Sequence, residues 1–110
     1  MTTIWHKPNC STSAYVLKRM REGGIEPDIY LYMEEKPSKA EIERVLKQLK
    51  LKPSELLRTK EDDAKPLIGQ SEAKILAAMA KNPVLIERPI VIQGRKAFVA
   101  RPKERVEELF

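Results

Sequence analysis

Near its start the chain reads Thr3-Ile4-Trp5-His6-Lys7-Pro8-Asn9-Cys10-Ser11-Thr12-Ser13, where a short apolar run gives way to a polar, helix-like stretch. Residues 2–6 include β-branched and aromatic side chains, which predict a strand. The helix begins after Cys10, so this cysteine sits at a junction whose unpaired N–H groups and dipole favour an anion, here the reactive thiolate. A lone cysteine is more often an inert small hydrophobe, but its position, with His6 and Lys7 nearby, makes Cys10 the candidate nucleophile.

The strand and helix extend into a βαβ unit. Residues 11–22 predict a helix because their apolar side chains fall on one face, and Gly23 and Gly24 end it. A second strand follows at residues 28–33. Strands joined through a helix in this way run parallel with a right-handed crossover.

The middle of the chain predicts helices. Ser38 and Glu41 form the capping-box pattern ahead of apolar residues at helical spacing. A short helix begins near Pro53 and carries Leu56, Leu57 and Arg58. Residues 59–70 show no period and predict a loop, and Ser71 caps a further helix that ends before Asn82-Pro83.

The end of the chain returns to the period of strands. Residues 90–92 and 96–100 flank Gln93-Gly94-Arg95, which predicts a β-hairpin. A short helix follows from Pro102 to Phe110. The order predicts one α/β domain over residues 1–110: a mixed four-stranded sheet flanked by helices on both faces, with a helical segment inserted between the βαβ and ββα halves.

Composition narrows the class of protein. The 110 residues contain one cysteine, so no internal disulfide or cysteine-rich zinc site is expected, which suits a reducing compartment. No segment resembles a signal peptide or a membrane span. We expect a soluble, cytoplasmic protein with no metal site and no membrane partner.

The net charge of +5 raises the question of nucleic acid. Basic residues mostly alternate with acidic ones on helical faces, and no basic block contains aromatic residues. We therefore expect no nucleic-acid partner and interpret most of the charge as solvated surface. A site for a small anion built from a few arginines is the alternative reading.

Several ordered motifs carry a resemblance that covers practically the whole chain. The first is His6-Lys7-Pro8-Asn9-Cys10-Ser11-Thr12-Ser13, and the others are Gly24-Ile25-Glu26-Pro27, Leu56-Leu57-Arg58, Asn82-Pro83-Val84-Leu85-Ile86-Glu87-Arg88-Pro89-Ile90-Val91 and Ala100-Arg101-Pro102. Together they resemble the glutaredoxin-coupled arsenate reductase family, which implies a thioredoxin-like fold.

The resemblance assigns roles to residues. It implies that Cys10 is catalytic, that Arg58, Arg88 and Arg101 bind an oxyanion, and that His6 supports the active-site loop. N–H groups of Ser11, Thr12 and Ser13 would complete the anion cradle, and Pro89 would follow a cis peptide bond. One departure is visible: the connection between Arg58 and Asn82, which contains Lys65-Pro66-Leu67-Ile68, is shorter than usual for the family.

Simpler readings remain for some of these residues. An isolated arginine is usually solvated or paired with a carboxylate, and Glu87 precedes Arg88. His6 either stabilises the thiolate, as imidazolium or through a hydrogen bond, or is a strand-end histidine bonded to the backbone.

The number of cysteines sets the redox chemistry. A C-x-x-C site resolves its mixed disulfide with a second cysteine, but here Ser13 occupies that position. A Cys10 that is oxidised or bound to substrate must therefore be released by an external thiol: glutathione, glutaredoxin or another thiol donor. The resemblance implies arsenate or a similar oxyanion as substrate, glutathione as co-substrate, glutaredoxin as partner and no tightly bound cofactor. The alternatives are an Spx-type regulator that binds RNA polymerase, or a monothiol reductase with another substrate. Ser13 and Arg101 favour the enzyme.

Overall fold

The computed structural model describes all 110 residues, and they form two compact units. The first unit contains Met1–Tyr32 and Arg88–Phe110, and the second contains Met33–Glu87. No helix in either unit is both long and apolar enough to cross a membrane. The two units are described separately below.

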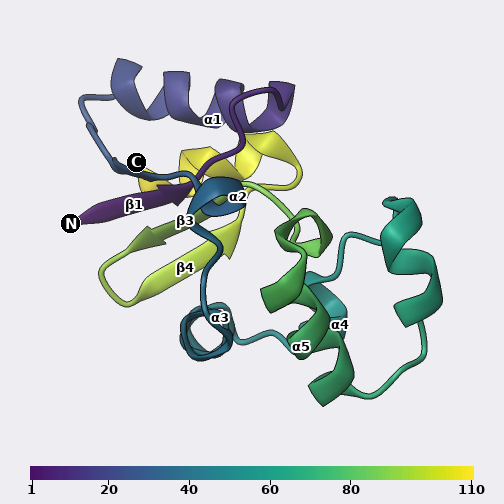
Figure 1. The fold of residues 1–110 in the computed structure, drawn as a ribbon. Helices are drawn as coiled ribbons and strands as arrows, with labels where there is room; N and C mark the ends of the chain where they lie inside the picture. The colour runs from purple at the N-terminus through teal and green to yellow at the C-terminus, as the bar shows by residue number, and fades with distance from the viewer. The chain divides into compact units, whose positions relative to one another are not determined.

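The first unit is built on a mixed four-stranded sheet with the strand order β2-β1-β3-β4 (Figure 1). β1 pairs in parallel with β2, whereas β3 is antiparallel to both β1 and β4. The register places Ile4 of β1 opposite Val91 of β3. The four strands are β1 (Thr2–Trp5), β2 (Asp28–Tyr30), β3 (Ile90–Gln93) and β4 (Lys96–Val99).

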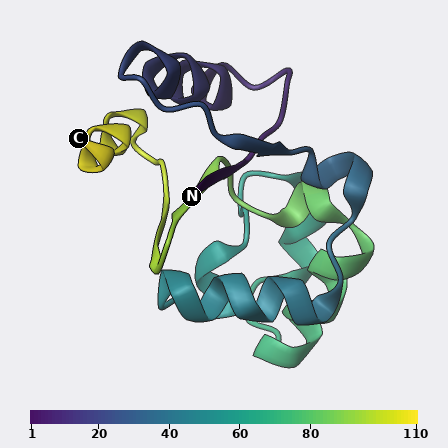
Figure 2. The same ribbon diagram turned by 90° about the vertical axis from the view of Figure 1, so that its left-hand side faces the viewer.

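Two helices pack together in this unit. α1 (Ser11–Glu22) contacts the C-terminal 3₁₀ helix η3 (Lys103–Leu109), and Figures 1 and 2 both show α1 beside this yellow segment. Their apolar faces share one core with the sheet, because side chains at alternate strand positions point to the same face. That core contains Ile4, Val91 and Phe98 from strands, Val16, Leu17 and Met20 from α1, together with Ala100 and Val106.

Three aromatic side chains, those of Trp5, Tyr30 and Tyr32, pack together outside this core. Trp5 follows Ile4 in β1 and therefore faces the opposite side of the sheet. The ring of Tyr30 lies 5.1 Å from that of Trp5, and the ring of Tyr32 stacks on it at 6.0 Å between centroids. Tyr32 is fully buried.

The second unit is helical. Its two longest helices, α3 and α5, contact each other and bury apolar residues such as Ile42 and Met79. Each has a serine N-cap: Ser38 Oγ accepts the N–H of Glu41, and Ser71 Oγ accepts the N–H of Lys74. The helices of this region are α2 (Tyr32–Glu35), which begins at the last residue of the first unit, α3 (Lys39–Leu49), α4 (Pro53–Leu56), η1 (Asp62–Leu67), α5 (Glu72–Lys81) and η2 (Pro83–Leu85).

The predicted fold class is confirmed: the chain has a thioredoxin-like α/β fold with a mixed sheet and helical segments between the two sets of strands. The cis peptide bond before Pro89 is also present, and a second one joins Arg101 to Pro102. That residues 1–110 form a single domain stays a prediction.

Three element predictions are wrong in detail. The second strand ends at Tyr30, because the chain turns there into α2 and buries Tyr32. Residues 59–70 contain the 3₁₀ helix η1, and such short helices leave little periodicity in a sequence. The predicted C-terminal helix is present, as the 3₁₀ helix η3. Leu57 lies outside α4, because it pairs with Ile86 in an antiparallel bridge.

Candidate active site

Cys10 is the N-cap residue of α1. Its backbone is extended, with φ −108° and ψ 120°, and its carbonyl accepts the N–H of Ala14 at 2.9 Å, the first bond of the helix. Its own N–H donates to the carbonyl of Lys7 at 3.1 Å, which closes the turn through Pro8 and Asn9. The strand and the helix thus fix the thiol where the unpaired N–H groups of α1 point.

The pKa of the Cys10 thiol is lowered overall. Burial acts first and raises the pKa, but it is outweighed by the N–H of Ser13, a hydrogen bond from the Arg88 side chain, the N–H of Thr12 and the charge of Arg88. All four favour the thiolate. The helix N–H groups and the arginine that the sequence analysis had named are thus responsible, whereas His6 and Lys7, which it had also suggested, are not among the causes.

Arg88 and Arg101 meet at this sulfur. Arg88 lies just before β3 and is buried, with 7% of its surface exposed. Arg101 follows β4, and its Nε donates to the carbonyl of Arg88 at 2.8 Å. This bond directs Nη2 of Arg101 towards Cys10 Sγ, 3.9 Å away. Two guanidinium groups from distant parts of the sequence therefore converge on one thiol.

His6 and Ser13 form a buried pair behind the loop. Nδ1 of His6 lies 2.6 Å from Oγ of Ser13, which also accepts the N–H of Lys7 at 3.2 Å. Ser13 is fully buried. Burial, and then the charge of Arg21, lower the pKa of His6 and favour the neutral ring. His6 therefore bonds a side chain, that of Ser13, rather than the backbone. The lowered pKa also disfavours the imidazolium form that was one of the predicted ways of stabilising the thiolate.

The three residues that follow Cys10 differ in whether their N–H groups act on its sulfur. The N–H groups of Thr12 and Ser13 reach the sulfur of Cys10, whereas that of Ser11 is not among the groups that shift its pKa. Ser11 is exposed to solvent. Thr12 and Ser13 are thus the main-chain donors of the loop that act on the thiol, and the anion cradle of Ser11, Thr12 and Ser13 stays a prediction.

Arg58 lies in the second unit and is held by carboxylates there. Its Nε is 3.2 Å from Oε1 of Glu61, and its Nη1 is 3.0 Å from Oε1 of Glu87. Burial lowers the pKa of Arg58, but bonds to Glu87 and Glu61 raise it overall. The sequence placed Glu87 beside Arg88 as a possible partner, and no spacing signal linked it to Arg58, 29 residues away.

Comparison with known proteins identifies the family of the chain. The sequence model of the ArsC family matches residues 5–109. An arsenate reductase of Haemophilus influenzae (strain ATCC 51907 / DSM 11121 / KW20 / Rd) is 37% identical over 111 residues, which cover 96% of each protein. The uncharacterized protein YfgD of Escherichia coli (strain K12) is 40% identical over 111 residues, covering 96% of this chain and 93% of YfgD.

A solved structure extends the likeness to three dimensions. The arsenate reductase from Vibrio cholerae superposes with a TM-score of 0.92 at 38% identity, covering 99% of this chain and 97% of that one. The chain belongs to the ArsC family.

Proposed function

We propose that the protein reduces arsenate to arsenite with glutathione and glutaredoxin, through a covalent bond between Cys10 and arsenic. The observation that carries this proposal is the convergence of two arginines on one activated thiol: Arg88 bonds the sulfur, and Nη2 of Arg101 is 3.9 Å from it. The family of the chain and the arsenate reductases that it resembles support the same substrate.

The substrate follows from the donors. Arsenate is a tetrahedral oxyanion, and guanidinium groups bind such oxygens through paired, charge-assisted hydrogen bonds. Arg88 and Arg101 would neutralise two of its oxygens while Sγ faces arsenic. The resemblance also assigns an oxyanion-binding role to Arg58, whose guanidinium Glu61 and Glu87 hold in place.

The reaction begins with nucleophilic attack. The Cys10 thiolate forms a bond to arsenic(V), and one oxygen ligand leaves as water after protonation. Charge that develops on the remaining oxygens is stabilised by the arginines. Glutathione then attacks the arsenic, which forms a second As–S bond and releases another oxygen as water, with no change of oxidation state.

Reduction occurs when glutaredoxin removes the glutathione. Its thiolate attacks the glutathione sulfur, the As–S bond breaks, and the electron pair of that bond reduces arsenic(V) to arsenic(III). The two thiols leave as a mixed disulfide. Water then displaces Cys10 and releases arsenite. The chain has a single cysteine, so it cannot resolve this adduct by itself.

A turnover assay tests the proposal. We expect arsenite to form only when arsenate, glutathione and glutaredoxin are all present, and Cys10→Ser to abolish it. Arg88→Ala and Arg58→Ala should each lower the rate about 10²–10³-fold, the usual effect of removing one preorganised donor. Arg101→Lys keeps the charge and loses the planar fork, so its rate should fall between wild type and Ala.

Circular dichroism of each variant controls for loss of folding. Wild-type rates in the arginine variants, or no glutathione-dependent reduction by the wild type, would contradict the proposal. RNA polymerase binding would then be tested, because it distinguishes an Spx-type regulator.

A further inference from the structure

The guanidinium of Arg58 is bonded by carboxylates on two sides. Its Nε lies 3.2 Å from Oε1 of Glu61, and its Nη1 lies 3.0 Å from Oε1 of Glu87. The Arg58 side chain is 16% exposed, and those of Glu61 and Glu87 are 30% and 28% exposed. We call these three side chains the Arg58 clamp. Because they are largely shielded from water, salt screens their attraction less than that of surface pairs.

The main chain places both carboxylates beside Arg58. The N–H of Arg58 donates to the carbonyl of Leu85 at 2.7 Å. On the other side of the short bridge between these segments, the N–H of Glu87 donates to the carbonyl of Leu56 at 3.0 Å. The N–H of Glu61 donates to the carbonyl of Arg58 at 3.0 Å and closes a turn. The clamp is therefore formed by the fold itself and needs no ligand to assemble.

The clamp leaves one nitrogen of the guanidinium for a ligand. A guanidinium carries five N–H donors on three nitrogens. The bonds to Glu61 and Glu87 use Nε and Nη1, so both N–H groups of Nη2 stay available. The side chain of Arg58 also keeps 16% of its surface exposed, which gives a small anion access to it.

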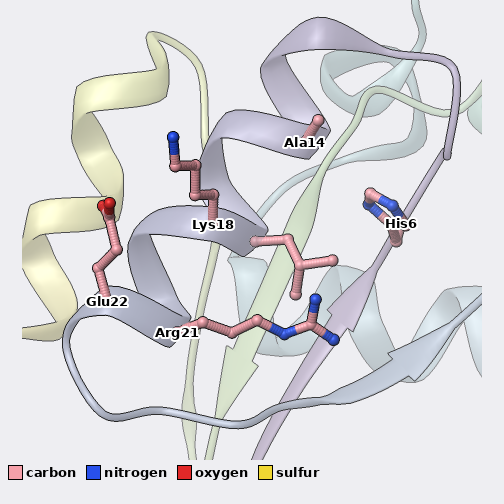
Figure 3. Close-up of a pocket in the computed structure, with 6 residues that line it drawn as sticks. His6, Ala14, Lys18, Arg21 and Glu22 are labelled. Atoms are coloured by element: carbon pink, nitrogen blue, oxygen red, sulfur yellow. The ribbon is translucent and has the colours of Figure 1, made fainter.

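Arg21 of α1 provides the contrast of an ordinary surface pair. Figure 3 shows its side chain extending along a cavity that His6 also lines, and Glu26 pairs with its Nε at 3.0 Å. These two side chains are 49% and 70% exposed. An exposed pair of this kind holds its partners only weakly. Arg58 differs because it has two carboxylate partners and is shielded from water.

We propose that Glu61 and Glu87 are positioning residues that hold Nη2 of Arg58 in place to bind the oxyanion. The proposal rests on the proposed function, in which Arg58 binds the oxyanion. A guanidinium that is held before the ligand arrives loses little conformational freedom on binding. Two carboxylates also offset the single charge of Arg58, so its contribution depends on where the donor lies more than on net charge.

Substitutions that separate position from charge test the proposal. Glu87→Asp keeps the carboxylate but withdraws it by one methylene, whereas Glu87→Gln removes the charge and keeps an acceptor oxygen at the same distance along the side chain. The probe is inorganic phosphate, a tetrahedral oxyanion that thiols do not reduce. Its binding is measured as the concentration that halves the rate of Cys10 alkylation. This concentration does not depend on the reactivity of the thiol itself, because it compares rates within one variant.

We expect Glu87→Asp to raise the half-protecting concentration of phosphate about tenfold, as for the loss of one well-placed hydrogen bond. Glu61→Asp should have the same effect from the other side of the guanidinium. Glu87→Gln should lie between wild type and Glu87→Asp. Glu26→Asp, which shortens the partner of the exposed Arg21, is the matched control and should not change phosphate binding.

A double-mutant cycle shows whether Glu87 acts through Arg58. In the Arg58→Ala background, Glu87→Asp should cause no further loss of phosphate binding, because the guanidinium that it positions is gone. The pH midpoint of Cys10 alkylation without phosphate should stay at the wild-type value in the Glu61 and Glu87 variants. Arg58 is not among the groups that shift the pKa of that thiol.

The outcomes separate this inference from the proposed function. Wild-type phosphate binding in both Asp variants, an equal loss in the Arg58→Ala background, or no protection of the wild type by phosphate would overturn the inference. If phosphate binding follows the expected pattern while the wild type fails to reduce arsenate, the positioning role stands and the proposed function fails.

Discussion

At Cys10, burial and hydrogen bonding act on the same thiol in opposite directions. Burial raises the pKa of the thiol, whereas N–H groups of Ser13 and Thr12 together with Arg88 lower it by more. The donors belong to the first turn of α1 and to Arg88, two residues before β3, so the fold itself supplies the activation. The reactivity of Cys10 thus depends on how the main chain of α1 is placed, and not only on the side chains of the loop.

This balance predicts the pH dependence of alkylation. With iodoacetamide, the rate should rise with a midpoint below about 8.5, the ordinary value for a free thiol. Arg88→Gln removes a hydrogen bond and a charge that favour the thiolate, so its midpoint should move upward. Arg95→Gln, at the exposed β3–β4 turn, is the matched control. A wild-type midpoint at or above that of a free thiol would contradict an activated Cys10.

The lowered pKa of His6 gives a second prediction about pH dependence. His6 is the only histidine, so its NMR signal is unambiguous. Burial and then Arg21 lower its pKa, so we expect the folded protein to titrate below 6.5. The unfolded chain binds this proton more readily, so the stabilisation is full above pH 6.5 and is lost as the pH falls through the native pKa.

The histidine experiment has a direct control. The free energy of unfolding should depend less on pH in His6→Gln than in wild type below pH 6.5. A folded-state midpoint at or above that of the urea-unfolded chain would show that His6 is not held in its neutral form.

Residue positions were predictable to different degrees. Cys10 could be placed because a strand signal and a helix signal meet there. Arg88 and Arg101 were assigned to the site only by the family resemblance, because an isolated arginine carries no signal of its own. The partners of Arg58 could not be placed, since Glu87 reaches it only after the chain pairs Leu57 with Ile86. The role of Ser13 as a buried partner of His6 also depends on tertiary contact, because a serine at a helix start reads as a local cap.

At the scale of elements, helices and strands with a clear apolar period or a capping residue were predictable, whereas the shortest helices were not. α1 begins and ends where the apolar period and the glycines indicate, and the hairpin turns at Gly94, whose φ of 60° favours glycine. The 3₁₀ helix η1 escaped because three residues per turn produce no lasting amphipathic stripe, whereas η3 was predicted as a short helix from the proline that precedes it. α2 escaped because its buried Tyr32 suits a strand equally well.

The N-cap of α3 gives an element-level prediction. Ser38 Oγ accepts the N–H of Glu41 at 3.1 Å, one of the donors that the helix leaves unpaired. Ser38→Ala should lower the free energy of unfolding by about 1 kcal/mol, measured by urea denaturation, and Ser38→Asp should restore most of it. Equal stability of all three proteins would show that the cap contributes nothing.

At the scale of the whole molecule, the question is how the two units unfold. Met20 is fully buried in the first unit and Met79 in the second. If residues 1–110 are one domain, Met20→Ala and Met79→Ala should each lower a single cooperative transition by about 2–5 kcal/mol. Ile68→Ala, at a 54% exposed position, should change little. Two separate transitions, each moved by only one substitution, would contradict the single-domain prediction.

The central claim for the molecule is that Cys10 carries arsenic during reduction. The most direct measurement is the intact mass of the protein, acid-quenched after mixing with arsenate and glutathione in the absence of glutaredoxin. The account predicts a transient mass gain corresponding to arsenic plus glutathione, located by peptide mapping on the single cysteine and absent from Cys10→Ser. Formation of arsenite at full rate by Cys10→Ser in the complete assay would contradict it.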